Sequence, residues 1–109
     1  MNSKQKGKRG ELELAELLRA HGYEARRGQQ FSGGDGSPDV VHSMPDIHFE
    51  CKRVERLDLE AALQQAKNDS GVLIPVVAHR KNRGQWLATL PLECFIAIYK
   101  GNHHGRSFD

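Results

Sequence analysis

The stretch PDVVHSMPDIHFECK, residues 38–52, decides the fold of this chain. Its second half alternates apolar and polar residues, as a strand does when one of its faces is buried. Glu50 and Lys52 are two residues apart in this strand and therefore project from the same face. Asp39 begins an earlier strand, and the turn-forming sequence between the two strands predicts a hairpin. Such a hairpin would place Asp39 beside Glu50.

Two carboxylates held side by side repel each other unless a cation lies between them. The cation expected with oxygen ligands and retained water is Mg²⁺, for which Mn²⁺ substitutes. Glu11 offers a third carboxylate: three residues before Leu14 and seven before Leu18, it points with the apolar side of a helix. Lys52 beside the metal would orient a water or neutralise charge on a phosphate under attack. Together these residues predict hydrolysis of a phosphodiester.

Each of these residues also has an ordinary interpretation. Glu11 in the first turn of its helix would interact favourably with the helix N-terminus. Glu50 and Lys52 would form a surface ion pair that contributes little to stability. The catalytic interpretation gains from Pro38, which fixes the entry to the Asp39 strand, and from the placement of Glu-x-Lys in an alternating strand.

The rest of the 109-residue chain predicts one small α/β domain with a central mixed β-sheet flanked by helices. In the first helix the inward stripe is Leu14, Leu17, Leu18 and His21, and Gly22 ends the helix. Residues 1–6 are expected to form a flexible basic arm, and residues 102–109 a flexible tail. The predicted order is α-β-β-β-α-β-β-α, with helices from about 7–10 to 21, 57–68 and 91–99, and strands at 23–27, 38–42, 47–53, 72–78 and 85–90.

Composition excludes several classes of protein. No run of 18 apolar residues is present, so no membrane span is expected, and the basic start lacks the apolar segment of a secretory signal. Cys51 and Cys94 are too far apart for a CxxC metal site and too few for a disulfide framework. A cytoplasmic protein of a bacterial, archaeal or phage-infected cell is expected.

The motif Pro38-Asp39 followed by Glu50-Cys51-Lys52 resembles the PD-(D/E)XK motif of restriction-endonuclease-like nucleases. In addition, GKRGELEL at residues 7–14, followed by HGY at 21–23, is similar to the opening helix of archaeal-type Holliday junction resolvases. Those proteins carry a glycine- and serine-rich loop before the Asp strand, as FSGG does here at residues 31–34. The resemblance covers residues 7–55 in motif detail and the remainder in element order.

The resemblance implies a restriction-endonuclease-like core and a Mg²⁺-dependent endonuclease that cuts four-way DNA junctions as a homodimer. It implies Glu11, Asp39 and Glu50 as metal-site carboxylates, with the Cys51 backbone carbonyl as a further ligand, and Lys52 as the catalytic lysine. The same core also serves restriction enzymes, nickases and phage recombination nucleases, so another DNase of this superfamily stays an alternative. A non-catalytic DNA-binding module is a third hypothesis, which the intact set of acids argues against.

The resemblance also implies Ser32 as a loop serine near the scissile phosphate, with Ser37 as an alternative. Two glutamines on the helix after the motif, Gln64 and Gln65, could approach the site, but ordinary surface amides are the favoured interpretation. His48 shares the face of Glu50 and Lys52, and a partly exposed structural histidine is favoured over a site residue.

Basic side chains are expected to bind DNA phosphates from the arm, the first strand and the turn before Trp86. The formal net charge is only +2, but with three acids assigned to metal, eleven acids remain against sixteen Lys and Arg. A chain that looks nearly neutral is therefore expected to be basic around a small acidic pocket. The expected DNA-binding residues are Lys4, Lys6, Lys8, Arg9, Arg26, Arg27, Arg53, Arg80, Lys81 and Arg83.

Overall fold

The structure is a computed structural model that describes residues 3–28 and 39–102, with side chains for all of these except 3–6 and 102. Its elements follow the predicted order α-β-β-β-α-β-β-α, and the predicted mixed α/β class with a restriction-endonuclease-like core is confirmed. Among the residues described, none of the helices is long and apolar enough to span a membrane. The elements are α1 (Ser3–Ala20), β1 (Ala25–Arg27), β2 (Val40–His42), β3 (Ile47–Arg53), α2 (Leu59–Asp69), β4 (Ile74–Arg80), β5 (Leu87–Thr89) and α3 (Leu92–Asn102).

Helix α1 begins earlier than predicted, at Ser3, so the backbone of most of the basic arm is helical. The periodicity of apolar residues could not show this, because residues 3–9 carry no apolar stripe. The predicted end is confirmed: Gly22 has φ +96°, and the Tyr23 amide donates to the Leu18 carbonyl at 3.1 Å. This left-handed glycine turn closes the helix and directs the chain into β1.

The predicted hairpin of β2 with β3 is wrong. β2 pairs antiparallel with β1, with Arg27 opposite Val40, whereas β3 pairs in parallel with β4 from Ile47↔Ile74 to Arg53↔Arg80. β5 then pairs antiparallel with β4. The seven-residue parallel ladder pairs the whole of β3, which a three-residue β2 could not do, and a turn signal in the sequence does not reveal such a distant partner.

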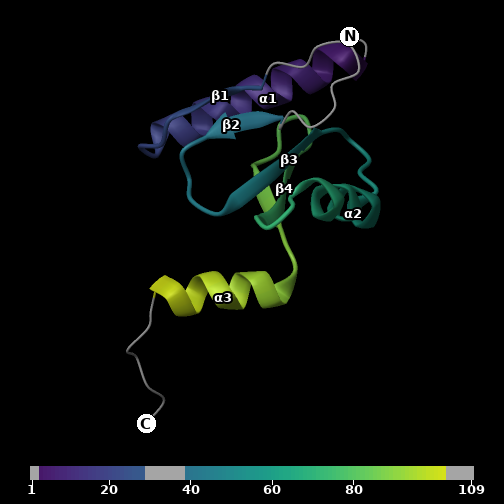
Figure 1. The fold of residues 1–109 in the computed structure, drawn as a ribbon. Helices are drawn as coiled ribbons and strands as arrows, with labels where there is room; N and C mark the ends of the chain where they lie inside the picture. Colours follow the sequence, from purple (N-terminus) through teal and green to yellow (C-terminus); the bar gives the residue numbers. More distant parts are fainter. Residues whose placement is uncertain (1–2, 29–38, 103–109) are drawn as a thin grey trace.

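The three-stranded sheet lies between two helices (Figure 1). On one face, α1 buries Leu14, Ala15 and Leu18 in a cluster that includes Phe49 from β3. On the other face, α2 contributes a second buried cluster around Ala62, Ala66 and Val77. The prediction that His21 belongs to the inward stripe of α1 is wrong, because its side chain is exposed beyond the end of the helix.

Helix α2 is fixed at its start by the predicted cap, because the Asp58 side chain accepts a hydrogen bond from the Ala61 amide at 3.1 Å. The strand after it begins at Ile74, so Val72 and Leu73 lie outside the sheet and are exposed. Pro75 is the second residue of β4 and lies opposite His48 of β3.

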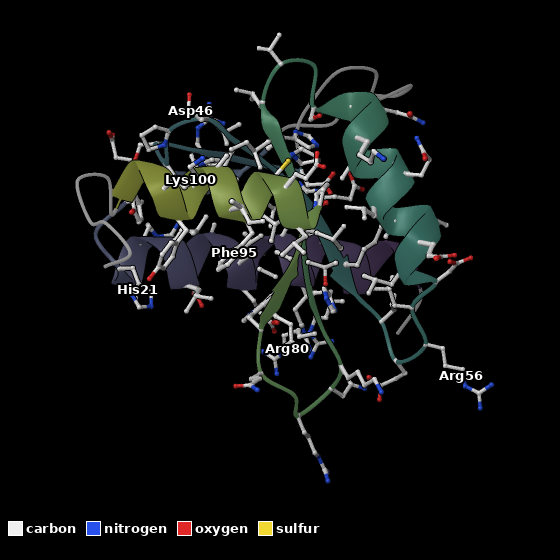
Figure 2. The ribbon with its side chains drawn as sticks, turned by 90° about the horizontal axis from the view of Figure 1, so that it is seen from below. His21, Asp46, Arg56, Arg80, Phe95 and Lys100 are labelled. Carbon is white, nitrogen blue, oxygen red and sulfur yellow. The ribbon has the colours of Figure 1, made fainter. Side chains whose placement is uncertain are left out.

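Helix α3 lies apart from the two covered faces of the sheet, below them in Figure 1. Its apolar side chains at Leu92, Phe95, Ile96 and Tyr99 are 45–70% exposed, and Figure 2 shows Phe95 among the side chains of this helix. These residues are spaced i, i+3, i+4 and i+7, so they share one face. The helix therefore carries an apolar stripe that the described part of the chain does not cover.

Two glycines of α1 offer a matched test of its packing on β3. A Cβ at Gly7 would meet nothing within 4 Å, whereas one at Gly10 would lie 2.8 Å from Arg53 Cβ. We expect Gly7→Ala to stabilise the protein by up to about 1 kcal/mol through helix propensity. Gly10→Ala should destabilise it, because overpacking costs about 1–3 kcal/mol. Urea unfolding followed by circular dichroism would measure both, and equal effects would show that α1 does not approach β3 this closely.

Candidate metal centre and nuclease site

Asp39 reaches the sheet through a hydrogen bond rather than through strand pairing. Its carboxylate Oδ2 accepts the backbone N–H of Cys51 at 2.9 Å. Asp39 directly precedes β2, and Cys51 follows Glu50 in β3. The predicted juxtaposition of Asp39 and Glu50 is therefore present, although the hairpin that predicted it is not.

Glu11 lies in the interior of α1, eight residues after the helix begins at Ser3. This position excludes the alternative in which Glu11 stabilises the helix N-terminus, since that effect is confined to the first turn. Its Oε1 accepts a hydrogen bond from Arg27 Nε at 2.7 Å. Burial raises the pKa of Glu11 despite this bond, and the nearby Asp39 charge raises it further. The Glu11 carboxylate is thus within electrostatic reach of Asp39.

Glu50 is 4% exposed, so the surface ion pair considered from the sequence is excluded. Burial is the main cause that raises the pKa of Glu50 to about 7, and the Asp39 carboxylate adds to it. Lys52 partly offsets this shift, with its Nζ 3.6 Å from Glu50 Oε2. Burial thus disfavours the charged form of Glu50, and acids with pKa values shifted in this way are typical of functional sites.

Lys52 has a second partner that the sequence interpretation did not favour. Its Nζ donates to Gln65 Oε1 at 3.3 Å, so Gln65 belongs to the surroundings of the motif lysine. Gln64 instead donates to Asn68 at 3.0 Å along α2. Both glutamines are exposed, as the surface-amide interpretation predicts, but Gln65 in addition contacts the motif lysine. The helical period could not separate the two, because Gln65 lies at the margin of the buried stripe of α2.

His48 is also placed differently from the favoured interpretation. It is 9% exposed, not partly exposed, and its Nε2 lies 3.9 Å from Glu50 Oε1. The alternation of β3 put His48 on the face of Glu50 correctly. Helix α2 covers that face, and the sequence of β3 alone does not predict where α2 lies.

The three carboxylates fit a divalent cation. Both pKa values that shift, those of Glu11 and Glu50, are raised by burial and by the charge of Asp39. Bringing a cation among them would offset that repulsion, and oxygen ligands of this kind suit Mg²⁺ or Mn²⁺. The donor set is therefore chemically consistent with a hard divalent metal.

Comparison with known protein families gives a match over most of the chain. Residues 2–91 match the family described as archaeal Holliday junction resolvase (Hjc). The chain belongs to this family. The family implies a nuclease that binds branched DNA and uses a divalent metal. Neither curated proteins nor solved structures yield a further match.

The family match includes β1 to β5 and α1, and ends just before α3 at Leu92. All four residues of the predicted nuclease site lie inside it: Glu11 of the opening helix and the motif residues Asp39, Glu50 and Lys52. Ser32 and Ser37 fall in the matched region but outside the described residues, and so do the side chains of Lys4 and Lys6. Their predicted roles stay predictions.

Three arginines of the resolvase-family chain that were expected to bind DNA are engaged with its own acids. Besides the bond from Arg27 to Glu11, Arg53 Nε lies 2.9 Å and Arg80 Nη1 3.4 Å from the same oxygen of Glu13. Glu13 of α1 thereby ties β3 and β4 to the helix. The other described residues of the predicted set are exposed: Lys8, Arg9, Arg26, Lys81 and Arg83.

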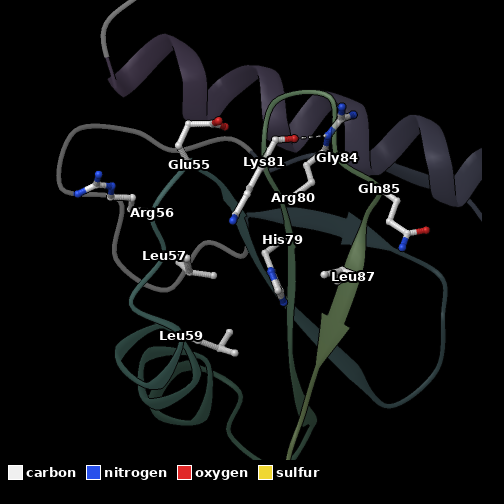
Figure 3. Close-up of a pocket in the computed structure, with 10 residues that line it drawn as sticks. All are labelled: Glu55, Arg56, Leu57, Leu59, His79, Arg80, Lys81, Gly84, Gln85 and Leu87. Atoms are coloured by element: carbon white, nitrogen blue, oxygen red, sulfur yellow. Dashed lines mark hydrogen bonds between the residues drawn. The ribbon is translucent and has the colours of Figure 1, made fainter.

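A pocket lies beside this arginine network, between the start of α2 and the β4–β5 connection (Figure 3). Leu57, Leu59 and Leu87 supply apolar walls, and Arg80 and Lys81 line it from the connection. None of the four predicted nuclease-site residues lines it, so the pocket is not the carboxylate site.

Removing the charge of Glu50 should stabilise the metal-free protein in a pH-dependent way. The pKa of Glu50 is about 7 in the folded chain and its ordinary value is 4.5, so folding takes up protons between these values. Stability contributed by the neutral acid is lost as pH rises through 7. In EDTA at pH 8 we expect Glu50→Gln to be more stable by roughly 1–3 kcal/mol, and at pH 4.5 to show little difference.

Urea unfolding at several pH values would measure this effect. The matched control is Glu16→Gln, which changes an exposed glutamate on α1 and should leave the pH dependence of the wild-type protein intact. A Glu50→Gln variant that is less stable than wild type at pH 8 would show that Lys52 compensates the buried charge fully.

Proposed function

We propose that the protein is a Mg²⁺-dependent, structure-selective endonuclease that resolves four-way DNA junctions. The observation that supports this most is the electrostatic effect of Asp39 on both Glu11 and Glu50, with Lys52 3.6 Å from Glu50, in a chain of the resolvase family. Two buried acids, Glu11 and Glu50, whose pKa values burial and the Asp39 charge raise, serve no purpose in a module that only binds a polyanion. A bound divalent metal would explain them.

Asp39, Glu50 and the Cys51 carbonyl would hold the metal, with Glu11 as the outer carboxylate. The N–H and C=O of one strand residue point to the same side of the strand. Because the Cys51 N–H points to Asp39, its carbonyl also faces the Asp39 side. When bound, the metal lowers the pKa of water and offsets charge on the phosphate.

Lys52 would hold the attacking water and stabilise negative charge on the phosphate. Lys52 Nζ donates a hydrogen bond to Gln65 and lies 3.6 Å from Glu50 Oε2, so two partners hold the ammonium group. Arg27 keeps Glu11 oriented toward the site. Ser32 is retained as a candidate near the scissile phosphate on the family resemblance alone.

Phosphate contacts would come from the predicted basic set around the site. Exposed Lys8 and Arg9 on α1, Arg26 on β1, and Lys81 and Arg83 after β4 are ready to bind, whereas Arg27, Arg53 and Arg80 must first be shared with their acids. Such contacts weaken with salt and show little preference for base sequence.

A second copy of the chain is the proposed partner of α3. Resolving a junction takes two incisions, which a two-fold dimer supplies with two equal sites. The stripe of Leu92, Phe95, Ile96 and Tyr99 is exposed, and such an apolar helix face is typical of a protein–protein interface. In a homodimer the same face on both copies would be buried.

Cleavage of defined DNA substrates tests the nuclease proposal. With Mg²⁺ we expect paired nicks in a synthetic four-way junction, much slower cleavage of a linear duplex, and no cleavage in EDTA. Asp39→Asn should lower the rate by at least about 10³-fold, because metal-centred charge stabilisation is lost. A denaturing gel under single-turnover conditions would measure the rates.

The Glu16→Gln variant serves as the control and should cut as fast as wild type. Cleavage of the duplex at the rate of the junction would favour another DNase of the superfamily over a resolvase. Absence of cleavage of any substrate with Mg²⁺ or Mn²⁺, while the junction is still bound, would favour a non-catalytic DNA-binding module.

Charge placed on the α3 stripe should break the homodimer. We expect the Phe95→Glu/Ile96→Glu variant to sediment as a monomer at concentrations at which wild type is a dimer, because two charges per copy would be buried. Ala97→Glu changes an exposed residue on the opposite face of α3 and should stay dimeric. Sedimentation equilibrium measures the outcome, and a monomeric wild type on and off DNA would exclude this interface.

A further inference from the structure

A second group of metal-binding side chains lies on the α2 face of β3. A ring nitrogen of His48 and carboxylate oxygens of Glu50 and Asp69 lie within 4.8 Å of one another. Three possible ligand atoms therefore lie close enough together to hold a metal ion. His48 and Asp69 are not part of the PD-(D/E)XK-like motif, so the group is distinct from the motif although it shares Glu50.

His48 gives the independent indication of a ligand. Its side chain is 9% exposed, and its Nε2 is buried without a hydrogen-bond partner among the described residues. A buried polar atom left unpaired costs free energy, so native structures rarely keep one without a reason. Nε2 faces Glu50 Oε1 at 3.9 Å, which is too long for a hydrogen bond but leaves room for an ion bound to both.

Asp69 adds to this indication through its position. It is the last residue of α2, where the helix dipole already places partial negative charge. A carboxylate at this end is unfavourable by itself, and its oxygen also lies within 4.8 Å of a Glu50 carboxylate oxygen. A cation at this point would relieve the repulsion between the two acids and the unfavourable end of α2 together.

We infer that His48, Glu50 and Asp69 form a second metal site, selective for a transition-metal ion of the zinc class. The imidazole nitrogen decides the class, because Zn²⁺ and Co²⁺ bind imidazole readily whereas Mg²⁺ prefers oxygen ligands alone. Three protein ligands with a fourth position open to water is a usual zinc coordination. The Asp69 side is exposed, so an ion can enter from solvent.

The geometry of Glu50 separates this site from the proposed nuclease site. Its Oε1 faces His48 at 3.9 Å, while its Oε2 faces Lys52 at 3.6 Å. One carboxylate thus lies between the two groups of residues. The zinc-class site does not rest on the proposed nuclease activity, because two of its three ligands serve no role there. A bound ion would tie the C-terminal end of α2 to β3.

Zinc affinity in untagged protein tests the site. We expect wild type to bind one Zn²⁺ in the presence of excess Mg²⁺, measured by competition with a fluorescent zinc indicator. Loss of an outer-shell partner typically lowers metal affinity about 10–100-fold, so loss of a direct ligand should lower it at least tenfold. His48→Gln and Asp69→Asn should both show this loss. Asp69 is exposed, so its variant remains informative if His48→Gln fails to fold.

Three controls make the result specific. His21→Gln changes an exposed histidine and should bind zinc as wild type does. The sequence also contains His103 and His104, so the measurement is repeated with both replaced by alanine. Asp39→Asn should keep its zinc affinity while it loses nuclease activity, which separates this site from the proposed function.

A readout that does not depend on affinity is the visible spectrum of the Co²⁺-loaded protein. We expect four-coordinate absorption bands in wild type that are absent in Asp69→Asn. The inference is overturned if His48→Gln and Asp69→Asn bind zinc as tightly as wild type. It is equally overturned if Asp39→Asn abolishes zinc binding while those two variants retain it, since the ion would then lie among the motif carboxylates.

Discussion

The hydrogen bond from the Cys51 amide to the Asp39 carboxylate is the constraint on which the site depends. β2 and β3 are not paired in a ladder, so regular backbone bonding does not fix their separation. The 2.9 Å bond performs that task, and it does so through the carboxylate itself. Strand position and acid position are therefore set by the same contact. Charge-assisted bonds of this kind are stronger than neutral ones, and this one acts together with the packing of the His42 ring against Phe49, 4.9 Å apart.

Glu11 is brought to the same place by the two-stranded ribbon of β1 and β2. Arg27 lies opposite Val40 in this ribbon, and Val40 follows Asp39 directly. The ribbon thus carries both the acid Asp39 and the arginine that holds Glu11 at 2.7 Å. Because α1 packs on β1 and on β3, the acid on the helix and the acid on β3 both lie within electrostatic range of Asp39, without sharing a strand pair.

The sequence predicts interactions between residues that are close together in the chain, but not those between distant segments. The alternation of β3, the Asp58 cap and the Gly22 turn are local, and the structure confirms each of them. The partner of β3 is not local, and a turn signal between β2 and β3 gave the wrong pairing. Asp39 lies near Glu50, as predicted, but not because β2 and β3 pair. Instead, the Asp39 carboxylate accepts a hydrogen bond from the amide of Cys51, the residue after Glu50.

The candidate site divides in the same way. Spacing in β3 placed Glu50, Lys52 and His48 on one face, but burial of His48 and the contact of Lys52 with Gln65 depend on where α2 lies over that face. α2 reaches the sheet through Ala62 and Ala66, which are small enough to let the helix lie close to Val77. The pattern of residues along a strand predicts which face of the sheet a side chain lies on. Which residue it contacts there depends on how the covering helix packs on that face.

The net charge of the chain overstates the number of basic side chains that are available to DNA. Without the three metal-site acids the chain has a clear excess of basic residues, but Arg27, Arg53 and Arg80 form ion pairs with Glu11 and Glu13 inside the fold. The charge available to DNA is correspondingly smaller and is divided between α1, β1 and the turn after β4. Because each neutralised phosphate adds about 0.9 to the salt dependence of duplex binding, a small set of exposed cations gives modest affinity for any straight duplex. The proposed selectivity for branched DNA would then have to come from geometry, since only a substrate that reaches several of these separated cations together can engage them all.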